Sequence, residues 1–187
     1  DPQGLHVVPF KKPTTEELDH DFLWRVHKEV PAKGQIAIFN RSHYEDIIAV
    51  RVKKIFPDPV WKRRYKHVLD FESMLAEEGT VIIKLFLNIS KEEQKKRLES
   101  RLQDPDKLWK FCMDDLDDRN RWDEFQTAYQ DLIEKTSTPE APWYIIPADR
   151  KWYRNLVVAR LMVEKLRHLQ LSLPTPNFDP ASIIIPD

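Results

Sequence analysis

The side chains with the clearest chemical capacity lie together in residues 39–46, FNRSHYED. They follow the apolar run 36–39, which is typical of a parallel strand buried on both faces. In open α/β sheets, ligands bind beyond the carboxyl ends of the strands, so we predict a functional site here. The planar guanidinium of Arg41 is suited to gripping a phosphate with two hydrogen bonds, although a structural salt bridge is an equal alternative.

Composition narrows the class of protein. The 187 residues suffice for one domain with a real core, and 30 Lys and Arg nearly balance 31 Asp and Glu. This balance argues against nucleic-acid and membrane partners, so a polyanion site would have to be a local basic patch. The single Cys112 excludes an internal disulfide, suits a reducing compartment and is expected to be packed. No apolar run reaches the roughly 20 residues that span a bilayer, and we expect a cytoplasmic protein.

Hydrophobic periodicity and capping signals predict alternating strands and helices. Thr14 with Glu17 and Ser90 with Glu93 have the spacing of capping boxes. The predicted strands are 7–10, 36–39, 81–87 and 143–146, and the predicted helices are 14–25, 44–52, 61–75, 90–101, 114–134 and 152–169. Residues 106–113 are expected to form a loop. This alternation predicts an α/β fold with a mostly parallel sheet, in a single domain over 1–187 with an extended tail over 172–187.

Four segments of the chain resemble a known family. They are PQGLHVVPFKKPTTEELDHDFLWR (2–25), FNRSHYED (39–46), SKEEQKKRLESRLQDPDKLWKF (90–111) and STPEAPWYIIPADRKW (137–152). Together they are similar to the second polyphosphate kinase family, the polyphosphate:nucleotide phosphotransferases, and they cover nearly the whole chain in the same order. The form NRSHYE resembles the branch that phosphorylates both nucleoside mono- and diphosphates.

The resemblance implies a P-loop kinase core related to thymidylate kinase, with a helical lid over about 104–135. Residues 7–10, 36–39, 81–87 and 143–146 would then be the second to fifth strands, and 36–39 would be the Walker B strand. The first strand, with its Walker A loop, would lie between the third and fourth strands. It is not among these residues, so we expect a preceding segment, without which turnover would be negligible.

The resemblance also implies roles for single residues around the first site. Arg41 and Arg101 would be catalytic. Asn40 stands where related proteins carry Asp, and with Glu45 it would help to choose the nucleotide acceptor. The alternatives are a helix cap at Asn40 and a solvated Glu45. His43 and Tyr44 could line the acceptor pocket, but we favour a packed aromatic pair.

A second group of cations lies on the predicted lid. Arg97 and Arg101 are spaced i, i+4 and share a helix face. With them, a channel for polyphosphate would use Lys107, Lys110, Arg119 and Arg121. The alternative is a solvated basic surface in which Arg97 pairs with Glu93. Arg150, in the family-like string ADRKW, would contact phosphate or base, or cap the last helix.

A run of aspartates could be interpreted as a metal site, but we reject this interpretation. Its members are Asp114, Asp115, Asp117 and Asp118. Negative charge is favoured at a helix N-terminus, so we assign the run to the start of the helix expected at 114. The Mg²⁺ that the resemblance implies would be held by phosphate oxygens and by carboxylates of the expected preceding loop.

The sequence thus predicts a transferase that moves the terminal phosphoryl group of inorganic polyphosphate to AMP or ADP, reversibly and with Mg²⁺. Its partners would be polyphosphate, AMP, ADP and ATP, and we expect a homo-oligomer. One alternative is an ATP-dependent nucleotide kinase. Another is a non-catalytic partner that lacks the P-loop.

Overall fold

The structure, a computed structural model, describes residues 4–172 and 175–186. Pro2 and Gln3 of the first family-like string and Pro174 of the predicted tail lie outside the described residues. The chain divides into two compact units, one of residues 1–86 and 90–145 and one of residues 87–89 and 146–187. Whether they form the single expected domain stays a prediction.

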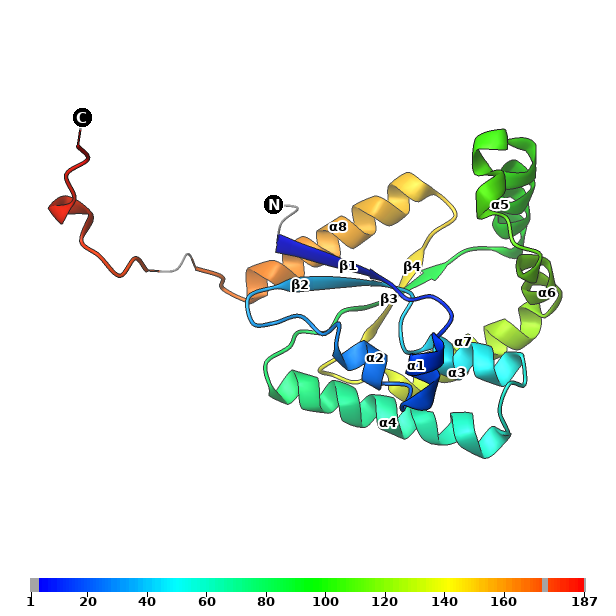
Figure 1. The fold of residues 1–187 in the computed structure, drawn as a ribbon. Coiled ribbons are helices and arrows are strands. Elements are labelled where there is room, and N and C mark those ends of the chain that lie inside the picture. The colour runs from blue at the N-terminus through cyan, green and yellow to red at the C-terminus, as the bar shows by residue number, and fades with distance from the viewer. Residues whose placement is uncertain (1–3, 173–174, 187) are drawn as a thin grey trace. The chain divides into compact units, whose positions relative to one another are not determined.

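The first unit is built on two parallel strands (Figure 1). β1 (Leu5–Pro9) pairs with β2 (Ile36–Asn40), from Leu5 opposite Ile36 to Pro9 opposite Asn40. Beyond the strands, the Phe10 amide donates to the Asn40 carbonyl at 3.0 Å. Because the strands are parallel, the polar residues that follow both of them emerge at one edge of the sheet.

Only one face of this strand pair is well buried. Val8 and Phe10 pack with Val26 and Phe71, whereas the side chain of Val7 is 57% exposed. The expectation that 36–39 is buried on both faces is therefore wrong for the described residues, since Ile38 is 45% exposed. The physical reason is that the helices packed against this pair in the first unit, α2 (Trp24–His27) and α4 (Asp58–Glu77), contribute to a core on one side.

The first predicted helix is two short helices. The capping box is confirmed: Glu17 N donates to Thr14 Oγ1 at 3.2 Å, and Thr14 N donates to Glu17 Oε2 at 2.7 Å. However, α1 (Thr15–Asp19) ends early, and α2 follows after a break. The break arises because Asp21 starts a new turn, in which its carboxylate accepts from Leu23 N at 2.9 Å.

The next two helices agree with the sequence. α3 (Glu45–Val52) follows the FNRSHYED segment directly, and α4 is longer than the predicted 61–75. Gly79 follows α4 with a φ of 92°, a left-handed conformation that side chains with a Cβ rarely adopt. α4 is thus terminated by a residue suited to a C-terminal cap.

The region after β3 (Lys84–Asn88) is helical and more broken than predicted. α5 (Lys91–Gln103) is capped by Ser90 Oγ, which accepts from Glu93 N at 3.1 Å. The predicted loop contains a 3-10 helix, η2 (Pro105–Lys110). The single helix predicted over 114–134 is α6 (Asp114–Asn120) and α7 (Trp122–Thr136), separated at Arg121. Arg121 donates to the Val52 carbonyl at 2.8 Å. The helix is thus interrupted at a residue that contacts a distant part of the chain.

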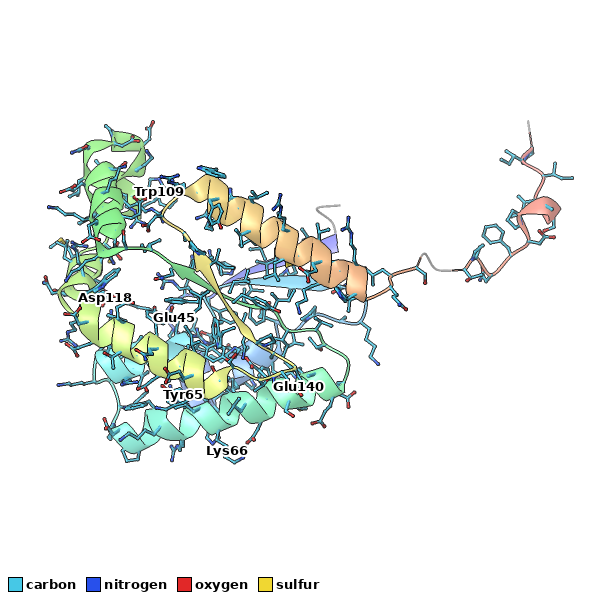
Figure 2. The ribbon with its side chains drawn as sticks, turned by 180° about the vertical axis from the view of Figure 1, so that it is seen from behind. Glu45, Tyr65, Lys66, Trp109, Asp118 and Glu140 are labelled. Carbon is cyan, nitrogen blue, oxygen red and sulfur yellow. The ribbon has the colours of Figure 1, made fainter. Side chains whose placement is uncertain are left out.

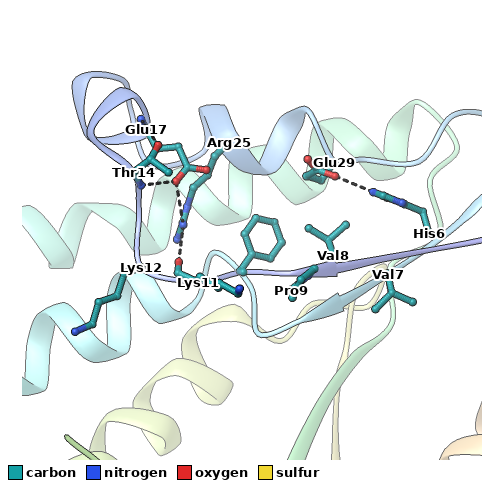
Figure 3. Close-up of a pocket in the computed structure, with 11 residues that line it drawn as sticks. His6, Val7, Val8, Pro9, Lys11, Lys12, Thr14, Glu17, Arg25 and Glu29 are labelled. Carbon is teal, nitrogen blue, oxygen red and sulfur yellow. Dashed lines mark hydrogen bonds and ion pairs between the residues drawn. The ribbon is translucent and has the colours of Figure 1, made fainter. Parts of the chain in front are cut away.

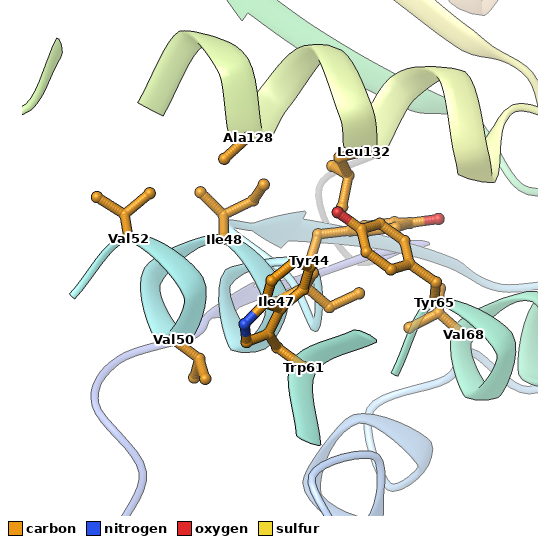
Figure 4. Packing of buried hydrophobic residues seen from close by; sticks show 10 residues of the cluster. All are labelled: Tyr44, Ile47, Ile48, Val50, Val52, Trp61, Tyr65, Val68, Ala128 and Leu132. Carbon is orange, nitrogen blue, oxygen red and sulfur yellow. The ribbon is translucent and has the colours of Figure 1, made fainter. Parts of the chain in front are cut away.

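The main core lies among α3, α4 and α7 (Figure 4). It contains Tyr44, Ile47, Ile48, Val50, Val52, Trp61, Tyr65, Val68, Ala128 and Leu132. Ala128 is fully buried, and its small side chain suits a close approach of α7 to α3. This core sets α3, and hence the turn before it, against the lid helix α7.

The second strand pair and the last helix complete the description. β3 pairs with β4 (Trp143–Pro147), and the boundary between the units crosses both strands. In the second unit, α8 (Lys151–His168) is followed by a tail whose described part is exposed and contains a short turn, η3 (Pro180–Ser182). Within the described ranges, every helix is too short or too polar to cross a bilayer.

Candidate functional site

The turn after β2 holds a residue in an unusual backbone conformation. Arg41 has a φ of 63°, in the left-handed region that non-glycine residues seldom occupy. The chain then turns into α3, with Glu45 N donating to the Ser42 carbonyl at 3.0 Å and Asp46 N to the His43 carbonyl at 3.1 Å. Such conformations persist where the surrounding structure enforces them, and they cluster at functional sites.

Two arginines fix the end of this turn. Arg25 Nη2 donates to Asp46 Oδ2 at 3.1 Å, and Arg64 Nη1 donates to the Asp46 carbonyl at 2.5 Å. Arg25 also donates from Nη1 to the Lys11 carbonyl at 2.9 Å. The buried Arg25 therefore ties the segment after β1 to the segment after β2.

Glu45 and Arg41, both predicted from the sequence, are brought together. Burial raises the pKa of Glu45, the charge of Arg41 opposes this rise, and nearby Asp118 of α6 adds to it. The pKa of Tyr129 on α7 is raised by burial and by the charges of Glu45 and Asp118. Lys53 Nζ lies 2.7 Å from Asp118 Oδ1. Figure 2 labels Glu45 and Asp118, which come from α3 and from the lid. The turn and α6 therefore share one electrostatic environment.

A cavity of about 380 Å³ lies along β1 and the segment that follows it (Figure 3). Its polar lining includes Lys11, Lys12, Thr14, Glu17 and Arg25. The guanidinium of Arg25 is held between the Lys11 carbonyl and Glu17, whose Oε2 lies 3.7 Å from Nη1. Lys11 and Lys12 add two exposed ammonium groups to this lining, and that of Lys12 lies 3.3 Å from Asp114 Oδ2.

The predicted lid cations lie on α5, η2, α6 and the α6–α7 junction, and they already have partners. Arg101 Nη1 lies 3.1 Å from Asp115 Oδ2, and Lys107 Nζ lies 2.5 Å from Asp104 Oδ2. Arg119 donates to the Lys91 carbonyl at 2.7 Å. Lys110 Nζ lies 4.9 Å from the centre of the Trp109 ring. The predicted channel residues thus have partners in the lid, in α5 or at the end of α3.

The acidic run does more than begin a helix. α6 starts at Asp114, as expected, with Asp114, Asp115 and Asp117 in its first turn. Asp114 Oδ2 also lies 3.3 Å from Lys12 Nζ, and Asp115 and Asp118 pair with Arg101 and Lys53. Three aspartates of the run therefore hold cations, one of them from the segment after β1.

Other expectations have mixed outcomes. Arg97 Nε pairs with Glu93 Oε1 at 2.7 Å, as one alternative predicted. His43 and Tyr44 form the packed aromatic pair, with ring centres 4.5 Å apart. The expectation that Cys112 is packed is wrong, since its side chain is exposed in the short connection between η2 and α6. Arg150 belongs to the second unit, where it stands at the N-cap of α8.

Sequence reasoning missed a buried charged cluster beside the turn. Lys84 Nζ donates to Glu72 Oε2 at 2.7 Å, to the Thr136 carbonyl at 2.6 Å and to the Tyr44 hydroxyl oxygen at 3.1 Å. Burial acts to raise the pKa of Glu72, but His43, Lys84 and Tyr44 outweigh it and leave this pKa below its ordinary value. The available signals were a Lys inside the apolar run 81–87 and a Glu on the apolar face of the helix over 61–75.

Comparison with known proteins places this geometry in a family. The family model of polyphosphate kinase 2 matches residues 1–173. The AMP/ADP-polyphosphate phosphotransferase of Meiothermus ruber is 53% identical over 184 residues, which are 98% of this chain and 69% of that protein. The ADP-polyphosphate phosphotransferase of Rhodopseudomonas palustris is 40% identical over 185 residues, covering 92% of this chain and 64% of that protein.

A solved structure agrees with these sequence matches. The crystal structure of polyphosphate kinase 2 from Arthrobacter aurescens TC1 superposes with a TM-score of 0.94 at 49% identity, over 97% of this chain and 64% of that one. The chain thus spans about two thirds of the length of these relatives. The predicted α/β fold with parallel strands, of the P-loop kinase type, is confirmed, and the chain belongs to the polyphosphate kinase 2 family.

Proposed function

We propose that this chain provides the acceptor side and the lid of a nucleotide phosphotransferase, which moves phosphoryl groups from inorganic polyphosphate to AMP or ADP. The names of its relatives support this substrate class. The observation that carries the proposal is the exposed Arg41, held with a φ of 63° at the carboxyl end of β2 and beside the partly buried Glu45. Phosphoryl transfer depends mainly on positioning and on charge stabilisation, which a fixed guanidinium supplies.

The acceptor would bind over the turn. In this arrangement Arg41 grips a phosphate oxygen of the nucleotide, and Asn40 and Glu45 select between mono- and diphosphate acceptors. The raised pKa of Glu45 supports this role, because a carboxyl group that is less readily ionised repels a nucleotide phosphate less than an ionised one.

The donor would bind along the lid, residues 104–135. Lys107, Lys110, Arg119 and Arg121 would hold the polyphosphate chain, and Arg101 would exchange Asp115 for a phosphate oxygen. The ion pairs of the lid support this role, since they are partly exposed and are therefore weak enough to be displaced by a polyanion. Arg150, in the second unit, stays a predicted contact for phosphate or base.

The described residues do not fit a protein-held Mg²⁺ site. No group of three or more His, Cys, Asp or Glu side chains among them is arranged to hold a metal ion. Asn40 offers a neutral amide, which binds this hard cation less well than a carboxylate does. We therefore assign no metal ligand to this chain and derive no step through the metal.

Donor choice tests the proposal. The native full-length protein is given AMP and polyphosphate without ATP, and the nucleotides are separated by chromatography. ADP and ATP should appear. Product that forms only when ATP is the donor would favour an ATP-dependent nucleotide kinase, and no product with either donor would favour a non-catalytic partner. The homo-oligomer and the cytoplasmic location stay predictions, and light scattering of the purified protein tests the first.

A further inference from the structure

A buried ion pair lies directly beneath the turn that carries Arg41. Lys84 is 6% exposed and Glu72 is 4% exposed, and their charged atoms are 2.7 Å apart. The Lys84 ammonium has two further acceptors, the Thr136 carbonyl at 2.6 Å and the Tyr44 hydroxyl at 3.1 Å. The pair thus connects β3, α4, the residue before α3 and the last turn of the lid helix α7.

Stability alone does not account for this pair. Removing two charges from water is costly, and replacing a buried ion pair with apolar residues of similar volume is often neutral or stabilising. Tyr44, whose hydroxyl contacts both charged groups, belongs to the apolar core together with Val68 and Leu132. A pair that is costly to bury beside such a core calls for another role.

The contacts of the pair with residues of the turn indicate this other role. The Tyr44 hydroxyl donates to Glu72 Oε1 at 2.6 Å, and His43 Nε2 lies 3.4 Å from the same oxygen. These two residues stand between Arg41 and Glu45. A left-handed residue such as Arg41 keeps its conformation only when its neighbours are fixed.

We propose that Lys84 and Glu72 are positioning residues for phosphoryl transfer: by anchoring Tyr44, against whose ring His43 packs, they hold the turn that presents Arg41 and Glu45. The proposal rests on the proposed function, because it assigns the turn a part in that reaction. Through the Thr136 carbonyl, the same ammonium also ties the turn to the C-terminal end of α7, where a cation is favoured by the helix dipole.

The test is a double substitution, Lys84→Met with Glu72→Leu, in the native full-length protein. Both charges are removed together, so neither is left buried without its partner, and thermal unfolding checks that the variant still folds. Loss of positioning should lower kcat by roughly 10- to 100-fold, with much smaller changes in KM for either substrate. Tyr44→Phe removes only the hydroxyl and should lower kcat in the same direction by a smaller factor.

A matched control is the pair Arg51 and Asp131, whose charged atoms are 2.6 Å apart between α3 and α7 but do not contact the turn. Arg51→Met with Asp131→Leu should leave kcat as in the wild type. Amide hydrogen exchange at residues 42–46 is measured in every variant, and it should become faster in the Lys84/Glu72 double variant and in Tyr44→Phe only.

Amide hydrogen exchange distinguishes failure of the proposed function from failure of the positioning role. If the wild type transfers no phosphoryl group from polyphosphate, the proposed function is wrong. If amide exchange at residues 42–46 is as slow in the double variant as in the wild type, the positioning role is wrong. Wild-type kcat in that variant also overturns it. If the double variant does not fold, Tyr44→Phe decides by the same two measurements.

Discussion

Glycine and alanine at position 41 should separate the strain of the turn from its function. A left-handed backbone costs a residue with a Cβ about 1–2 kcal/mol, and glycine avoids this cost. Glycine loses more chain entropy on folding, by about 0.5–1 kcal/mol relative to alanine. With a φ of 63°, Arg41→Gly should therefore be more stable than Arg41→Ala by about 0.5–1 kcal/mol, or about 1–4 °C in melting temperature for a chain of this size.

Transfer should fall in both variants. A hydrogen bond to a charged group contributes about 1.5–3 kcal/mol, so loss of one between the guanidinium and a phosphate predicts a reduction of about 10- to 100-fold in rate. Thermal unfolding followed by circular dichroism gives the first quantity. Initial rates of ADP and ATP formation from AMP and polyphosphate give the second.

Lys54 is the matched control. It is exposed, lies just after α3 and has a φ of 53°, but it is not part of the proposed site. Lys54→Gly should exceed Lys54→Ala in stability by the same amount, with the transfer rate unchanged. An Arg41→Gly variant that is less stable than Arg41→Ala would refute the strain argument, and a full transfer rate in both Arg41 variants would refute the role of the guanidinium.

Three further predictions concern the lid, the turn and the core. Asp115→Asn should free Arg101 and lower KM for polyphosphate by up to about 5-fold, since an exposed ion pair contributes about 1 kcal/mol at most. A higher KM in steady-state assays would contradict this and would mean that Asp115 orients Arg101 for the donor. Burial raises the pKa of Glu45 above its ordinary 4.5, so the ionised side chain destabilises the fold increasingly as pH rises through that raised pKa. Glu45→Gln should therefore raise the melting temperature at neutral pH, and this gain should disappear below pH 4.5. Melting curves in which the gain is the same at every pH would contradict this. Ile48→Ala, at a position 1% exposed, should cost about 2–5 kcal/mol in urea unfolding, whereas Ile184→Ala, at a position 90% exposed, should change stability by less than about 0.5 kcal/mol; equal losses would contradict the described core.

Local signals in the sequence predicted much of the fold. The cap at Thr14, the cap at Ser90 and the end of α4 near Gly79 follow from interactions within a few residues, so they could be predicted without tertiary contacts. The breaks at 20–23 and at Arg121 were missed. At Arg121 the chain forms a hydrogen bond to Val52, a residue far away in the sequence, which no periodicity reveals.

The candidate site divides in the same way. Its position after β2 and its family-like residues Asn40, Arg41 and Glu45 could be predicted, because the apolar run and the polar segment are adjacent in the chain. Their roles stay predictions. The proximity of Glu45 to Asp118 could not be predicted, since it depends on how α6 is held against α3 by pairs such as Lys53 with Asp118.

The sequence by itself determined the order of strands and helices, the family and the segment in which to look for chemistry, since these depend on residue type and on short spacings. Only the tertiary structure decided that Lys84 and Glu72 meet beneath that segment, and that Arg101 pairs with Asp115 of the lid. Such pairs form between residues far apart in the chain, and their strength depends on burial and distance. Both quantities arise only when the helices pack.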